Sequence, residues 1–81
     1  MVKIYKRVSI ADIMNATIRR LRQLQALSQR ELATRARISV ATLNRIETGR
    51  RRPMPKTVRK IAEALGVSPQ ELLTEQPRLM S

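Results

Sequence analysis

The chain has 81 residues and contains no cysteine, histidine, tryptophan or phenylalanine. Without cysteine or histidine there is no disulfide, no thiolate chemistry and none of the common zinc sites. The missing imidazole also removes the usual general base of hydrolases. Asp and Glu total only 6, and helix caps and charge pairing account for them. We therefore expect neither an enzyme nor a protein that holds a metal or cofactor.

Long apolar runs are also absent, since none approaches the ~20 residues that cross a bilayer. The first eight residues, MVKIYKRV, alternate charged and apolar side chains, unlike a secretory signal. The sequence therefore predicts a cytoplasmic protein without a membrane association. Tyr5 is the sole aromatic residue, which offers no platform for stacking the bases of single-stranded nucleic acid.

Positive charge is what the chain has in excess. Lys and Arg total 17, which gives a formal net charge of +11. Such a charge repels itself and favours a polyanionic partner, nucleic acid before an anionic membrane surface. Membrane binding needs a helix face that is apolar and free, whereas the apolar faces here are needed for the core. We expect double-stranded DNA as the partner and localisation with the nucleoid.

Apolar residues recur at helical spacing from Ser9 onward, and the predicted fold is all-α. The first helix begins at Ser9 or Asp12 and ends near Gln25–Leu27. The other helices are predicted over residues 29–35, 40–48, 56–65 and, briefly, 69–74. We divide the chain into a basic arm or short strand (1–8), one helical domain (9–75) and a loose tail (76–81).

The most informative stretch runs from Ser28 to Gly49 and is predicted to form two short helices joined by a tight turn. Ser28 and Ser39 occupy capping positions, and Glu31 completes a capping box with Ser28. The inward residues are predicted to be Leu32, Ala33, Ile38, Leu43 and Ile46. This pattern leaves the second helix of the pair pointing outward, where it fits the major groove of duplex DNA.

The residues from about Ile18 to Leu73 resemble the helix-turn-helix domain of the lambda-repressor and Cro family, also called xenobiotic-response-element-like. The matching residues are Ile18, Leu21, Arg22, Leu27, Ser28, Gln29, Glu31, Leu32, Ala33, Ile38, Ser39, Thr42, Leu43, Arg45, Ile46, Glu47, Gly49, Pro53, Ile61, Ala62, Leu65, Gly66, Val67, Glu71, Leu72 and Leu73. The resemblance implies a five-helix domain that binds DNA and regulates transcription.

The exposed stripe of the third helix is predicted to contact the bases through Val40, Ala41, Asn44 and Arg45. Arg45 can donate two hydrogen bonds to guanine, Asn44 can pair with adenine, and the two small apolar residues can contact thymine methyl groups. The alternative is that these are ordinary solvated helix residues. Relatives more often carry a polar residue at the position of Val40.

Contacts to the DNA backbone are expected from hydroxyl, amide and guanidinium groups around this helix. The expected residues are Gln29, Ser39, Thr42, Thr48, Arg50, Arg51 and Arg52. In relatives, the residue at the position of Gln29 binds a phosphate and also supports the recognition helix. For Ser39 a purely capping role is the alternative. The resemblance further implies a partly buried salt bridge between Arg22 and Glu47, which ties the first helix to the third.

Two positions depart from the family pattern. Relatives usually have glycine where this chain has Arg37, because the residue in that turn is left-handed. Ala26 likewise replaces a glycine that often precedes the second helix. A left-handed Arg37 would cost the backbone roughly 1–2 kcal/mol.

The leading functional hypothesis is a sequence-specific transcriptional regulator that binds a palindromic operator as a homodimer, like phage repressors or controller proteins. Dimerisation is expected through Val67, Leu73, Leu79 and Met80, with Leu72 completing the core instead. A strand of the N-terminal segment that pairs across the twofold axis is the alternative. The alternative functions are an antitoxin that also holds a toxin, and a polyanion-binding protein without sequence preference.

Overall fold

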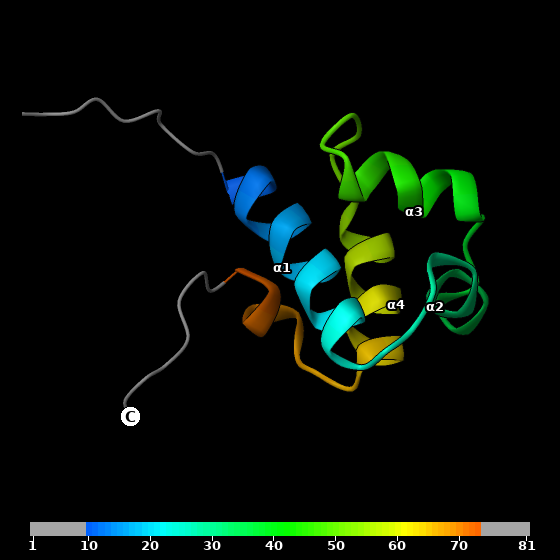
Figure 1. Ribbon diagram of the computed structural model, residues 1–81. Coiled ribbons are helices and arrows are strands. Elements are labelled where there is room, and N and C mark those ends of the chain that lie inside the picture. Colours follow the sequence, from blue (N-terminus) through cyan, green and yellow to red (C-terminus); the bar gives the residue numbers. More distant parts are fainter. Residues whose placement is uncertain (1–9, 74–81) are drawn as a thin grey trace, which may run out of the picture.

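The computed structural model describes residues 10–73 (Figure 1), which form four α-helices and one short 3-10 helix. Their bounds are α1 Ile10–Leu24, α2 Gln29–Ala36, α3 Val40–Glu47, α4 Pro55–Leu65 and η1 Pro69–Leu73. The described part contains no strand. The predicted arm over residues 1–8 and the predicted tail over 76–81 lie outside it. The all-α prediction is thus confirmed for residues 10–73.

The predicted caps are present at the start of α2 and α3. Ser28 Oγ accepts a hydrogen bond from the Glu31 amide at 3.0 Å, and Glu31 Oε1 accepts one from the Ser28 amide at 2.8 Å. Ser39 Oγ accepts from the Thr42 amide at 3.0 Å. Each cap satisfies a backbone N–H that has no partner inside its helix. These bonds fix where both helices of the helix-turn-helix begin.

Side chains from every element meet in one core. The largest fully buried residues are Ile18, Leu32, Leu43, Ile46, Ile61 and Leu72. Helix α4 occupies the middle of the molecule, with α1 on one side and the α2–α3 pair on the other, while η1 lies beside α1 (Figure 1). This packing holds α3 at the edge of the bundle with one face free.

The fifth helix is more tightly wound than an α-helix over the residues that the structure describes. The Glu71 side chain caps its start, with the Ser68 amide donating to Glu71 Oε2 at 3.0 Å and Ser68 Oγ donating to the same oxygen at 3.2 Å. The segment is nevertheless a 3-10 helix, and the Glu71 amide donates to Ser68 O at 3.0 Å. Five residues make too few turns to stabilise an α-helix, so the tighter three-residue spacing is favoured. The predicted fifth helix is therefore a 3-10 helix over Pro69–Leu73 rather than an α-helix.

The end of α1 also differs from the predicted amphipathic pattern. Leu24 is 70 % exposed, although its spacing suggested the inward face. Gln25 follows the helix instead and reaches α4, where its Nε2 donates to the carbonyl of Leu65 at 2.8 Å. Gln25 thereby satisfies one of the carbonyls left free at the end of α4.

Candidate nucleic-acid interface

Helix α3 presents the four predicted base-contacting residues on its free face. Val40 is 38 % exposed, and Ala41, Asn44 and Arg45 are exposed as well. The opposite face is fixed in the core, because Leu43 and Ile46 have no exposed surface. The helix therefore cannot rotate about its axis without losing its core contacts, which sets the outward direction of this face.

The amino end of α3 carries two hydroxyl groups that bond to each other. Ser39 Oγ donates to Thr42 Oγ1 at 2.9 Å while it accepts from the Thr42 amide. Thr42 is half-buried and Ser39 is exposed. This arrangement closes the cap and leaves neighbouring backbone N–H groups of the first turn without a helical partner. Such groups at a helix N-terminus attract phosphate oxygens.

A compact turn follows the carboxyl end of α3. Thr48 Oγ1 donates to the carbonyl of Asn44 at 2.8 Å, and the amides of Arg50 and Arg51 donate to the carbonyl of Arg45 at 2.8 and 3.1 Å. Gly49 adopts φ +78°, a left-handed conformation that glycine takes without strain. The turn folds back onto the carboxyl end of the helix, so the backbone of Arg50 and Arg51 is tied to the last turn of α3.

The side chains of this turn form a basic cluster of Arg50, Arg51 and Arg52. All three are exposed, and within residues 10–73 none of them is paired with a carboxylate. An arginine without a carboxylate partner keeps its full charge and its five N–H donors for a phosphate. The cluster is therefore free to act on a polyanion.

A salt bridge joins α1 to α3. Arg22 Nε donates to Glu47 Oε2 at 2.7 Å and Nη2 donates to Oε1 at 2.9 Å, so the pair is bidentate. Arg22 Nη1 also donates to the carbonyl of Leu27 at 2.8 Å. The two side chains are only 12 % and 2 % exposed. The hydrogen bonds to Glu47 raise the pKa of the Arg22 guanidinium, while its burial acts in the opposite direction.

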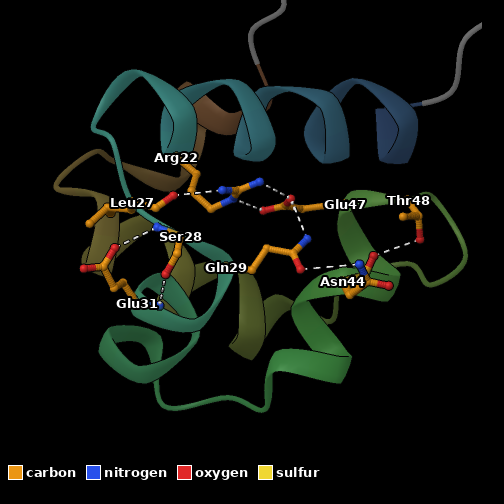
Figure 2. Close-up of polar contacts among 8 residues, drawn as sticks. All are labelled: Arg22, Leu27, Ser28, Gln29, Glu31, Asn44, Glu47 and Thr48. Atoms are coloured by element: carbon orange, nitrogen blue, oxygen red, sulfur yellow. Dashed lines mark hydrogen bonds and ion pairs between the residues drawn. The ribbon is translucent and has the colours of Figure 1, made fainter.

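Gln29 extends this salt bridge to the exposed face; the resemblance implied a contact between Gln29 and the recognition helix but not its partners there. Its Nε2 donates to Glu47 Oε1 at 3.0 Å, and its Oε1 accepts from Asn44 Nδ2 at 3.4 Å. Figure 2 shows the continuous path from Arg22 through Glu47 and Gln29 to Asn44. The available signal was the placement of Gln29 at the start of one helix and Glu47 at the end of the next.

Two of the four predicted dimerisation residues, Val67 and Leu73, lie within the described part of the chain. Val67 is half-buried against the core, whereas Leu73 is 44 % exposed at the end of η1. Leu79 and Met80 lie outside the described residues. Leu72 is fully buried, which confirms its predicted place in the core.

Residues 10–73 offer neither a metal site nor a membrane span. No cluster of three or more Asp or Glu residues is placed to hold a metal ion there. None of the helices in this range has the length and apolar character needed to span a bilayer.

The sequence model of the helix-turn-helix family matches residues 18–72. An uncharacterised HTH-type transcriptional regulator, y4dJ of Sinorhizobium fredii, is 39 % identical over 67 residues, which are 83 % of this chain and 87 % of that protein. The clp gene regulator ClgR of Corynebacterium glutamicum superposes with a TM-score of 0.81 at 27 % identity, over 86 % of this chain and 74 % of that one. The restriction-modification controller protein C.AhdI of Aeromonas hydrophila gives 0.74 at 29 % identity, over 76 % and 94 % of the two chains.

Proposed function

This chain belongs to the helix-turn-helix family, and from that membership we propose that it is a DNA-binding transcriptional regulator with α3 as its recognition helix. The observation that carries the proposal is the fixed outward face of α3 with Val40, Ala41, Asn44 and Arg45. A helix presented in this way enters the major groove, where each base pair shows a distinct pattern of donors and acceptors. The names of the relatives and the net charge of +11 support the same reading.

The groups around α3 supply the contacts to the DNA backbone. Gln29 and the amino end of α3 at Ser39 and Thr42 bind phosphates on one side of the groove. Thr48 and the cluster Arg50–Arg52 bind them on the other side. These contacts set the orientation of α3 and most of the affinity, while the base contacts set the sequence preference.

The regulator acts as a homodimer on a palindromic operator. One recognition helix of 8 residues reads only a few base pairs, and two copies related by a twofold axis read half-sites about 34 Å apart. Leu73 is 44 % exposed and adjoins the core through its neighbour Leu72, which makes the end of η1 a suitable contact between copies. Val67, Leu79 and Met80 complete this contact.

Sedimentation distinguishes this contact from pairing of the N-terminal segment. The L73E variant places a charge in the contact, and we expect it to sediment as a monomer. Removal of residues 1–6 should leave the dimer intact. If the shortened chain is the monomer and the L73E variant the dimer, the N-terminal strand makes the contact instead.

The test of the proposed function is a binding titration at two salt concentrations. Duplexes selected from a random pool provide the operator, and a scrambled duplex of the same length is the control. We expect strong salt dependence on both duplexes, with a residual preference of roughly a thousandfold or more for the operator. Equal affinity for every duplex would show a polyanion-binding protein and overturn the proposal.

A further inference from the structure

In the chain of hydrogen bonds from Arg22 to Asn44, the charge on Glu47 determines which group donates and which accepts at each step. A carboxylate has no hydrogen to donate, so Glu47 accepts every bond that it makes. Its Oε2 accepts from Arg22 Nε, and its Oε1 accepts from Arg22 Nη2 at 2.9 Å and from Gln29 Nε2 at 3.0 Å. Gln29 must therefore turn its NH₂ group toward Glu47.

The orientation of Gln29 sets that of Asn44 in turn. With its NH₂ group on Glu47, Gln29 presents its carbonyl oxygen to α3, where Oε1 lies 3.4 Å from Asn44 Nδ2. The opposite orientation of Asn44 would place two carbonyl oxygens against each other. The oxygen and nitrogen of a side-chain amide can normally be exchanged by a 180° flip. Here the Glu47 carboxylate, which can only accept, fixes which end of each amide faces which way.

Asn44 is thus held with its NH₂ group toward Gln29 and its Oδ1 free on the exposed face of α3 (Figure 2). One of the two Nδ2 hydrogens serves Gln29, and the hydrogen on the Oδ1 side stays free. A free acceptor beside a free donor matches the N6 amino group and N7 of adenine. Guanine presents two acceptors, O6 and N7, and so opposes Oδ1.

We propose that Glu47, acting through Gln29, is a positioning residue that fixes the amide of Asn44 for the recognition of adenine. The inference rests on the proposed function, because it requires α3 to lie in the major groove. It adds a role for the buried salt bridge beyond holding α1 to α3. Val40 has no polar side-chain atom, so the first residue of α3 offers Gln29 no competing bond.

The experiment uses the full chain and four duplexes that differ at one base pair of the selected operator. That pair is identified as the one whose preference N44A abolishes. We expect the wild-type chain to favour adenine there by on the order of tenfold. In Q29M, which keeps the length of the side chain without its polar end, this preference should fall to about twofold. R45A is the matched control and should lose preference at a different base pair only.

A double variant separates positioning from a direct backbone contact. If Gln29 acts on base preference through Asn44, Q29M in the N44A background changes no base preference further. E47Q tests the start of the path, because an amide at position 47 can face Gln29 with either end. Provided that its circular dichroism matches the wild-type spectrum, E47Q should reduce the adenine preference as Q29M does. A folded E47Q that keeps the full adenine preference would overturn the role of Glu47, while Q29M and the double variant test the link from Gln29 to Asn44 independently of it.

Three further results would overturn the inference while leaving the proposed function intact. In the first, Q29M weakens all four duplexes equally, as a phosphate contact alone would. In the second, Q29M keeps the full adenine preference. In the third, N44A abolishes no preference at any base pair. Failure of the wild-type chain to select any operator would instead overturn the proposed function.

Discussion

Arg22 of α1 and Glu47 of α3 are 25 residues apart and are joined by two hydrogen bonds of 2.7 and 2.9 Å. With Glu47 removed, the guanidinium would remain in a site where its side chain is only 12 % exposed. Leaving one charge of a buried pair without its partner typically costs ~3–5 kcal/mol. We therefore expect E47A to lower the free energy of unfolding by about that amount, as measured by urea denaturation.

The control for this prediction is E63A. Glu63 is exposed on α4, and a substitution at such a position usually changes stability by no more than about 0.5 kcal/mol. Equal unfolding midpoints for E47A and the wild-type chain would show that the salt bridge adds nothing to the stability of the domain.

R45A and R51A should change DNA binding in different ways, because Arg45 is proposed to contact a base and Arg51 to bind a phosphate. R45A should lose ~1–3 kcal/mol of discrimination at one base pair of the operator. R51A should weaken binding to all duplexes alike and reduce the slope of log K against log salt by about 0.9. Titrations of both variants against operator and scrambled duplexes measure these effects. A loss of base preference in R51A would contradict the assignment.

Short-range sequence patterns predicted much of the fold. Serine caps act within a few residues, so Ser28 and Ser39 mark the starts of their helices without any tertiary contact. Helical spacing likewise placed Leu43 and Ile46 in the core. The spacing rule failed at Leu24, which ends α1 on its exposed side and is 70 % exposed.

The site was less accessible to sequence reasoning than the fold. Exposed positions on α3 followed from the spacing of its buried residues, and the salt bridge followed from the family resemblance. The bond between Gln29 and Glu47 spans 18 residues and two helices, so its formation depends on the crossing of α2 and α3. No local pattern encodes that crossing, and the orientation of Asn44 depends on it.

Two non-glycine residues within the described range 10–73 are left-handed, namely Ala26 with φ +56° and Arg37 with φ +59°. The resemblance implied this for Arg37, since relatives carry glycine there. Glycine avoids the left-handed cost of ~1–2 kcal/mol but loses more entropy on folding. We expect A26G and R37G each to stabilise the domain by about 0.5–1 kcal/mol, which raises Tm by about 4 °C in calorimetry.

A glycine placed in a helix should have the opposite effect. Arg35 is exposed in the last turn of α2, so R35G should lower stability by up to about 1 kcal/mol. If R37G were destabilising to the same degree as R35G, the left-handed backbone at Arg37 would carry no strain in the wild-type chain.

The capping box of α2 should give the domain a pH-dependent component of stability. The Glu31 carboxylate accepts from the Ser28 amide at 2.8 Å, and the bonds from the Ser28 backbone and side chain lower the pKa of Glu31 below its ordinary value of 4.5. A carboxyl group whose pKa is lower in the folded state stabilises that state above its ordinary pKa. The contribution is lost as the pH falls through the lowered value.

E31Q keeps the acceptor for Ser28 without the charge, so the wild-type chain should have the higher Tm at neutral pH. The difference should shrink between about pH 5 and pH 3, and a gap that stays constant over this range would contradict the assignment.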